Sequence, residues 1–105
     1  MFLAQWSFDM QYGARQETMS MVKEFGSAIE KLPGWRSKKT RVLWGSIGAP
    51  ESRVVIEHEF ASLSDLEASW TAIQGSQDFF RNMVTQMRTV IVSGTPRWEV
   101  YRVLD

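Results

Sequence analysis

The chain contains no cysteine, so it can form no disulfide and offers no thiolate for catalysis or for binding zinc or an iron–sulfur cluster. It also lacks an excess of charge of either sign, because twelve basic side chains balance twelve acidic ones. A balanced chain has no overall field that would attract nucleic acid or an anionic membrane surface, and we expect it to bind neither. No apolar run approaches the length of a transmembrane helix, and the opening MFLAQWSFDM lacks the basic segment of a signal peptide. We expect a cytoplasmic protein with a single domain over residues 1–105.

Motifs that hold cofactors are missing as well. The sequence has no glycine-rich phosphate loop, no dinucleotide fingerprint, and a single histidine, His58, so no cluster of histidines and carboxylates stands at metal-ligand spacing. Glu57 and Glu59 flank His58, but side chains alternate across a strand, and one chain cannot wrap these three around a metal. We expect neither a cofactor nor a metal.

Aromatic residues, by contrast, are abundant, with five tryptophans and six phenylalanines in 105 residues. In FLAQWSFD, residues 2–9, they occupy alternate positions, which predicts a strand with one apolar face. Apolar residues then recur every three or four positions up to Pro33, which predicts a helix. Two extended runs, residues 37–47 and 52–60, flank a turn-rich GAPE segment and should pair as an antiparallel hairpin.

A second helical region follows the hairpin. SLSDLE predicts a capping box with Ser64 as N-cap and Glu67 three positions later. Gly75 should break this region into two helices, the second of which carries its apolar residues at helical spacing. RWEVYRVL, residues 97–104, alternates again and predicts the last strand.

The order of these elements is β-α-β-β-α-β, which predicts a ferredoxin-like α+β fold: one antiparallel sheet with the helices on one face. The other face of the sheet would then be uncovered. In so short a chain the simplest cover is a second copy, so we expect a homodimer.

Three segments, VVIEHEFASLSDLE, QDFFRNM and RWEVYRVL, resemble the dimeric α/β-barrel superfamily, and most closely its NIPSNAP-like and antibiotic-biosynthesis-monooxygenase-like members. The resemblance covers almost the whole chain. It implies a dimer with a small-molecule pocket between sheet and helices. Members of the superfamily include heme-degrading and cofactor-free monooxygenases, dehydratases, isomerases and domains with no assigned activity. The better-known heme-degrading members carry their histidine on a helix, and neither helical region here has one.

His58 is the candidate catalytic residue. Alternation along residues 52–60 places it with Val54, Ile56 and Phe60 on the face toward the helices, where the resemblance implies a substrate pocket. An imidazole there could act as a general base, donate a hydrogen bond to a substrate, or bind a heme iron. The alternative is a core histidine satisfied by a neighbour.

Charged residues on the opposite face are predicted to form a polar network where two sheets meet. Buried charges persist only when they are paired, and arginines on adjacent strands are the available partners for the glutamates. Paired carboxylates that do acid–base chemistry are the alternative. The predicted network consists of Arg41, Arg53, Glu57, Glu59 and Tyr101.

A pocket for an apolar or aromatic ligand would be lined by large aromatic side chains, although these more commonly form plain core. Arg102 lies on the otherwise apolar face of the last strand and must either reach out to solvent or meet an anion. The candidate ligand-binding residues are Trp6, Phe25, Trp44, Trp70 and Arg102.

Three functions are compatible with these patterns: an uncharacterised small-molecule-binding protein, a cofactor-independent monooxygenase or isomerase that uses His58 as base, and a purely structural dimerisation module. An open cavity that reaches His58 would favour the first two, and a filled core around a hydrogen-bonded His58 would favour the third.

Overall fold

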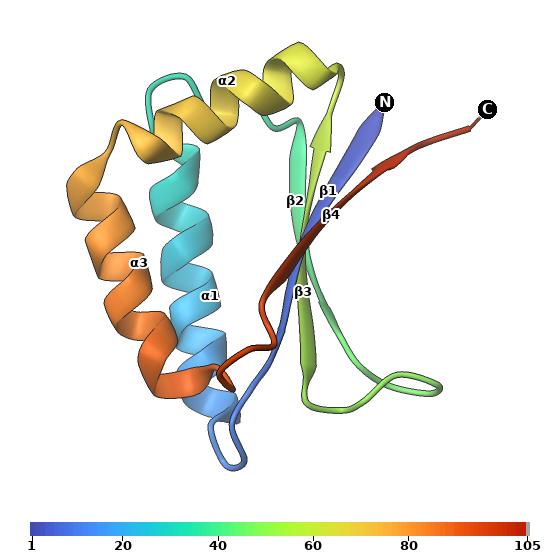
Figure 1. Ribbon diagram of the computed structural model, residues 1–105, viewed down its shortest axis with the longest axis vertical. Coiled ribbons are helices and arrows are strands. Elements are labelled where there is room, and N and C mark those ends of the chain that lie inside the picture. The colour runs from blue at the N-terminus through green and yellow to red at the C-terminus, as the bar shows by residue number, and fades with distance from the viewer. Residues whose placement is uncertain (105) are drawn as a thin grey trace.

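Seven elements follow one another along residues 1–104, the part of the chain that this computed structural model describes. Figure 1 shows a single sheet with all three helices on one side of it. The elements are β1 (Phe2–Asp9), α1 (Arg15–Glu30), β2 (Lys39–Trp44), β3 (Arg53–Phe60), α2 (Leu63–Gln74), α3 (Gln77–Val90) and β4 (Arg97–Arg102).

The sheet has the strand order β2-β3-β1-β4, and every neighbouring pair is antiparallel. β2 and β3 form the predicted hairpin, and α2 and α3 are separated at Gly75 as predicted. This is the ferredoxin-like α+β arrangement, so the predicted fold class is confirmed.

The core lies between the sheet and α1. Alternation along β1 places Ala4, Trp6 and Phe8 on the helix side, where all three are buried. α1 turns Phe25 and Ile29 toward them, as its three-and-four spacing predicts. Burial of each large apolar side chain contributes about 1.5–3 kcal/mol, so this contact is the main source of stability.

The N-cap of α2 lies two residues before the predicted position. The N-cap is Ser62, not Ser64: Ser62 has an extended backbone, and its Oγ accepts a hydrogen bond from the Asp65 backbone N–H at 3.2 Å. β3 ends at Phe60, so the chain has already turned when it reaches Ser62, and Ser64 falls inside the first turn. The predicted capping box of Ser64 and Glu67 is therefore wrong.

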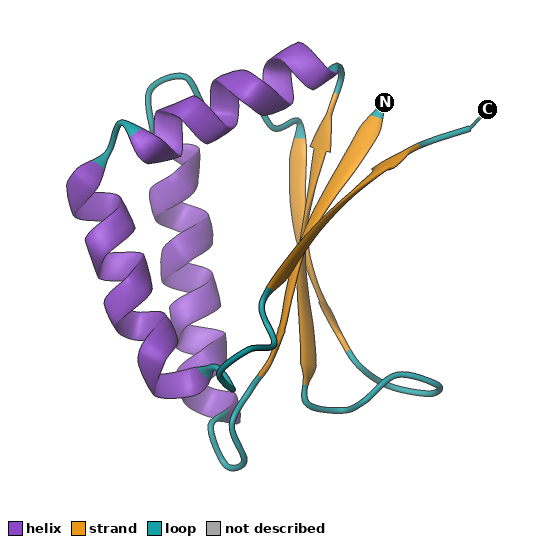
Figure 2. Ribbon diagram, viewed as in Figure 1, coloured by secondary structure: helices purple, strands orange, loops and turns teal. Residues whose placement is uncertain are grey.

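The face of the sheet away from the helices, which we call the bare face, is covered by no helix within residues 1–104 (Figure 2). It carries the alternate residues of each strand, among them Gln5, Val55, Glu57 and Tyr101. Tyr101 and Leu43 on this face are exposed large side chains. No helix within residues 1–104 is long and apolar enough to cross a membrane.

α3 packs less completely than the other helices. Six of its fourteen residues are apolar, yet only Val90, at its end, is buried. The other apolar residues face a space between α3 and the sheet. They are Phe79, Phe80, Met83, Val84 and Met87.

Candidate functional site

Two adjoining cavities, which we call chambers, lie under α3 and share four lining residues. The smaller, the α1 chamber, has a volume of about 140 Å³ and lies between α1 and α3 over Ile56 of β3. The larger, the β4 chamber, has a volume of about 410 Å³ and lies between α3, α2 and β4. Both chambers are lined by Trp6, Phe25, Met83 and Met87, and we call the two together the α3 pocket.

Three indole rings form one side of the β4 chamber. Trp6 and Trp98 face each other across the β1–β4 pair, with ring centroids 6.2 Å apart and planes inclined by 26°. Trp70 of α2 meets Trp98 edge-on, with centroids 5.9 Å apart. The register explains the first contact, since opposite residues of an antiparallel pair have adjacent side chains on the same face.

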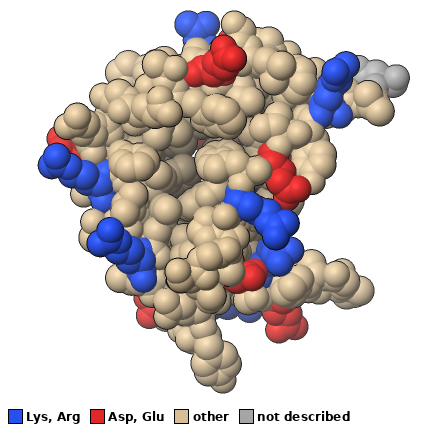
Figure 3. Space-filling model, in the orientation of Figure 1, with Lys and Arg blue, Asp and Glu red and all other residues tan. Residues whose placement is uncertain are grey.

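The β4 chamber is open to solvent. Figure 3 shows a hollow near the centre of the molecular face seen in Figure 1, bordered by uncharged side chains. Trp70, Phe80 and Trp98 all line this chamber, and each is more than a third exposed. A group of exposed apolar side chains around an open cavity is typical of a binding site.

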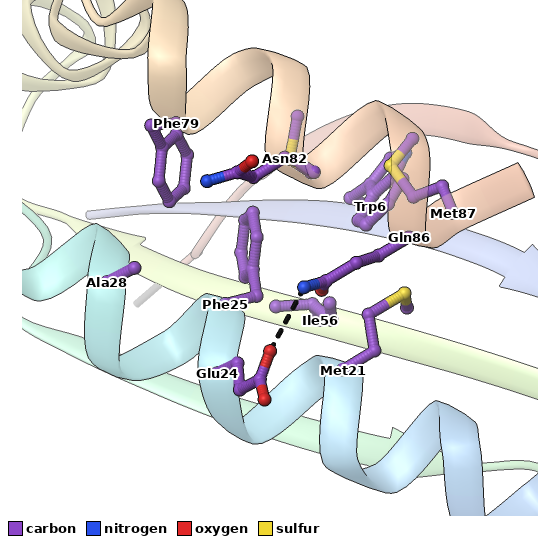
Figure 4. Close-up of a pocket in the computed structure, with 11 residues that line it drawn as sticks. Trp6, Met21, Glu24, Phe25, Ala28, Ile56, Phe79, Asn82, Gln86 and Met87 are labelled. Atoms are coloured by element: carbon purple, nitrogen blue, oxygen red, sulfur yellow. Dashed lines mark hydrogen bonds between the residues drawn. The ribbon is translucent and has the colours of Figure 1, made fainter.

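The α1 chamber has a polar side where the two helices meet. In Figure 4 the Gln86 side chain of α3 donates a hydrogen bond to Glu24 Oε2 of α1, with a length of 3.0 Å. Asn82 lies on the same side, while Phe25 and Phe79 pack together with centroids 5.7 Å apart. The chamber therefore combines an aromatic interior with one carboxylate and two amides at its rim.

Of the predicted ligand-binding residues, the structure brings Trp6, Phe25 and Trp70 together in this pocket. Trp44 is elsewhere, because β2 is the edge strand on the far side of β3; its ring packs against the core and lies 5.3 Å below the Arg15 guanidinium. Arg102 shares a face with Trp98 but lies four residues further along β4, opposite Phe2, and is exposed. Because a strand rises about 3.4 Å per residue, four residues place Arg102 too far along β4 to line the pocket.

Other lining residues were not predicted as ligand-binding. Trp98 is the most important lining residue that the prediction left out. Alternation in RWEVYRVL puts it on the helix side, and its position opposite Trp6 makes it part of the pocket. The polar residues Glu24, Asn82 and Gln86 gave no sequence signal, since nothing in their local pattern shows that α1 and α3 lie side by side. The methionines Met83 and Met87 were predicted only as an apolar helix face.

His58 lies on the helix side of β3, as alternation predicts, but it lines neither chamber. Its ring is 1% exposed and is packed edge-on against Trp35, with centroids 5.0 Å apart. Nδ1 lies 2.8 Å from the Thr40 hydroxyl on the neighbouring strand, and Nε2 is buried with no hydrogen-bond partner. Burial lowers the pKa of His58 from 6.5 to about 4, against the opposing effect of the Glu57 carboxylate. The side chain is therefore neutral at pH 7.

Of the five residues in the predicted polar network, the structure brings Glu57 and Arg41 together. Glu57 is 3% exposed; it accepts hydrogen bonds from Gln5 Nε2 at 2.8 Å and from Arg41 Nε. Arg53 pairs instead with Asp9, with its Nε 3.3 Å from Oδ1, because Asp9 is its direct cross-strand neighbour.

The remaining two members of that network lie apart from Glu57. The Tyr101 hydroxyl donates to Glu99 at 2.9 Å, and this hydrogen bond raises the pKa of Tyr101 above 10.0. Glu59 takes part in none of the ion pairs found among residues 1–104. Within the same residues, no three histidine or carboxylate side chains lie close enough together to hold a metal ion.

The sequence matches no model of a protein family and no curated protein. Solved structures do match. Protein Atu4242 of Agrobacterium tumefaciens, a NIPSNAP family protein of unknown function, is 17% identical and superimposes with a TM-score of 0.74 over 97% of this chain and 92% of its own. An uncharacterised NIPSNAP-like domain protein from Burkholderia xenovorans is 14% identical, with a TM-score of 0.74 over 98% of this chain and 84% of its own.

A third match is a protein from Bordetella bronchiseptica whose assignment as an antibiotic biosynthesis monooxygenase is provisional. It is 14% identical, with a TM-score of 0.72 over 98% of this chain and 96% of its own. At these identities the likeness concerns the fold and not the chemistry. The chain shares its ferredoxin-like fold with these NIPSNAP proteins and with this provisionally assigned monooxygenase, and the resemblance drawn from its sequence is confirmed at the level of the fold.

Proposed function

We propose that this chain binds a small apolar or aromatic molecule in the α3 pocket. The observation that supports the proposal is the incomplete burial of the apolar side of α3: Phe79 packs on Phe25, but Phe80, Met83 and Met87 also line open space beside Trp6 and Phe25. A helix normally gains most of its stability from burying its apolar side. A ligand in the pocket would supply that burial.

The size and lining of the pocket agree with this role. Ligand pockets commonly have volumes of about 300–1,000 Å³, apolar walls and a few polar groups. The β4 chamber, at about 410 Å³, falls in that range, and the indoles of Trp6, Trp70 and Trp98 offer flat apolar surface for a ring system.

A catalytic role for His58 stays a prediction with less support. A general base must lie within hydrogen-bonding distance of the substrate proton, directly or through one water. His58 is enclosed by Trp35 and Thr40 and lines neither chamber, so a ligand in the pocket would not touch it. The monooxygenase alternative would therefore need another group as its base.

Replacement of Trp98 tests the binding role. Trp98→Ala removes one indole from the wall of the β4 chamber, and we expect it to weaken binding of the neutral naphthalene dye prodan about tenfold. The expectation follows from the roughly 0.5–1.5 kcal/mol that an aromatic pair contributes in addition to the apolar area it buries. Titration of the dye's fluorescence with protein measures the dissociation constant.

Tyr101→Ala is the matched control. Tyr101 is on the same strand and is 48% exposed, against 44% for Trp98, but it projects from the bare face. Equal loss of affinity in both variants, or no binding by the unmodified protein, would contradict the proposal.

We also propose that the bare face joins two copies of the chain. It is uncovered, and it presents Leu43, Val55 and Tyr101 around a central Glu57–Arg41 pair, so a second copy would bury apolar area and enclose the ion pair. A specific pair of this kind usually buries about 1,600 Å² in total.

Light scattering at micromolar concentration should therefore give twice the 12.1 kDa mass of the chain. Val55→Arg, which adds two charges to a homodimeric interface, is expected to give the monomer mass, because both copies place the charge at the same contact. Met19→Arg on the exposed side of α1 should stay dimeric. A monomeric unmodified protein would rule out the dimer.

A further inference from the structure

The α3 pocket lacks positive charge. Neither chamber is lined by a lysine, an arginine or the histidine; the ionisable residue that lines it is Glu24, beside the amides of Gln74, Asn82 and Gln86. An anionic group that entered would leave water without gaining a cationic partner, and it would approach a carboxylate. Burial of a charge under these conditions is unfavourable.

Glu24 can accept more hydrogen bonds than it does. A carboxylate has about four acceptor positions, and Gln86 Nε2 is the side-chain donor that the structure places on it, at Oε2. Because Glu24 is exposed at the rim of the α1 chamber, it can bind a cation there without itself being desolvated.

The aromatic rings of the pocket also favour a positively charged ligand. The face of an aromatic ring is the negative part of its quadrupole, and tryptophan attracts cations most strongly. Trp6 and Phe25 line both chambers, so a ligand that reaches from the indole wall to Glu24 would lie beside both rings. Cation–ring contact occurs elsewhere in this chain, where Arg15 lies over Trp44.

We propose that the α3 pocket selects a hydrophobic amine, that is, an apolar or aromatic body with a protonated ammonium group. The body lies in the β4 chamber against Trp6 and Trp98, and the ammonium group pairs with Glu24 at the rim of the α1 chamber. This inference rests on the proposed binding function and adds the charge of the ligand to it.

Three probes with the same ring and different charge test the inference: naphthylmethylamine, naphthalenemethanol and naphthoate, substituted at the same ring position. Calorimetric titration of the unmodified protein at neutral pH should give the tightest binding for the amine. We expect at least about a tenfold difference between amine and carboxylate, with the alcohol between them.

Glu24→Gln keeps the shape and the hydrogen bond to Gln86 while removing the charge. We expect it to weaken amine binding about threefold to fivefold, the size of an exposed ion pair, and to leave the alcohol unaffected. Glu30→Gln is the matched control, since Glu30 is exposed on the same helix but lines neither chamber, and it should alter none of the three affinities.

Carboxylate binding as tight as amine binding would overturn the inference while leaving the proposed function in place. Amine binding that is unchanged in Glu24→Gln would also overturn it, because the anchor would then lie elsewhere. If none of the three probes binds, the proposed function fails together with the inference.

Discussion

Lowering the pH from about 6.5 to about 4 is expected to reduce the free energy of unfolding by about 3 kcal/mol through His58. Burial lowers the pKa of this imidazole from 6.5 in the unfolded chain to about 4 in the folded protein. Between these values the unfolded state binds a proton that the folded state does not, so stability falls as the pH falls. The size follows from about 1.4 kcal/mol per pKa unit. Below pH 4 the folded protein is protonated too, and the contribution ends.

The comparison that isolates this effect is with His58→Gln, whose side chain does not titrate. Urea unfolding of both proteins at a fixed protein concentration and several pH values gives two curves of stability against pH. Carboxylates titrate in both proteins and cancel in the difference, and His58 is the one histidine in the sequence. The unmodified protein should lose about 3 kcal/mol more than the variant between pH 6.5 and 4. Parallel curves would show that the folded protein accepts the proton without cost.

The burial of His58 also affects its ability to act as a general base. A base with a pKa of about 4 holds a proton weakly at pH 7, far from the match to operating pH that efficient general bases show. Together with its enclosure by Trp35, this argues against His58 as a general base, and its catalytic role stays a prediction.

The strands and their faces could be predicted because the information is local. Alternation in residues 2–9 and 52–60 determines which side chains share a face, and the structure places Trp6 and His58 on the helix side accordingly. The cap of α2 was harder, since Ser62 and Ser64 both precede an acidic residue by three positions. Only the end of β3 at Phe60 decides between them.

Which residues line the pocket depends on how strands distant in the sequence pair with one another. Trp44 and Trp98 both follow the helix-side alternation of their strands, so facing alone does not distinguish them. The strand order does, because it places β4 beside β1 and β2 at the opposite edge. Trp98 therefore joins Trp6 at the pocket, and Trp44 does not.

The isolation of His58 from the pocket is non-local in the same way. It depends on Trp35, a residue of the connection between α1 and β2, which packs across both His58 and Phe60. Nothing in the periodicity of residues 52–60 indicates that neighbour. A sequence can therefore place a histidine on a face without showing whether that part of the face is open.

Glu57→Ala is expected to lower the free energy of unfolding by about 2–3 kcal/mol. The carboxylate is 3% exposed and accepts from Gln5 and Arg41, so its removal deprives two donors of a charged acceptor and leaves a small cavity. Removal of one partner of a fully buried ion pair costs about 3–5 kcal/mol. The cost here is smaller, because Arg41 is 49% exposed and can turn to water.

Glu59→Ala is the matched control on the same strand and face. Glu59 is only partly buried and belongs to none of the ion pairs among residues 1–104, so its loss should change stability by less than about 0.5 kcal/mol. Glu57→Gln should lie between the two, since an amide can still accept from Arg41 but carries no charge. Urea unfolding at neutral pH measures all three variants. Equal effects for Glu57→Ala and Glu59→Ala would mean that the Gln5–Glu57–Arg41 cluster contributes nothing beyond an exposed carboxylate, and the polar centre of the bare face would lose its structural role.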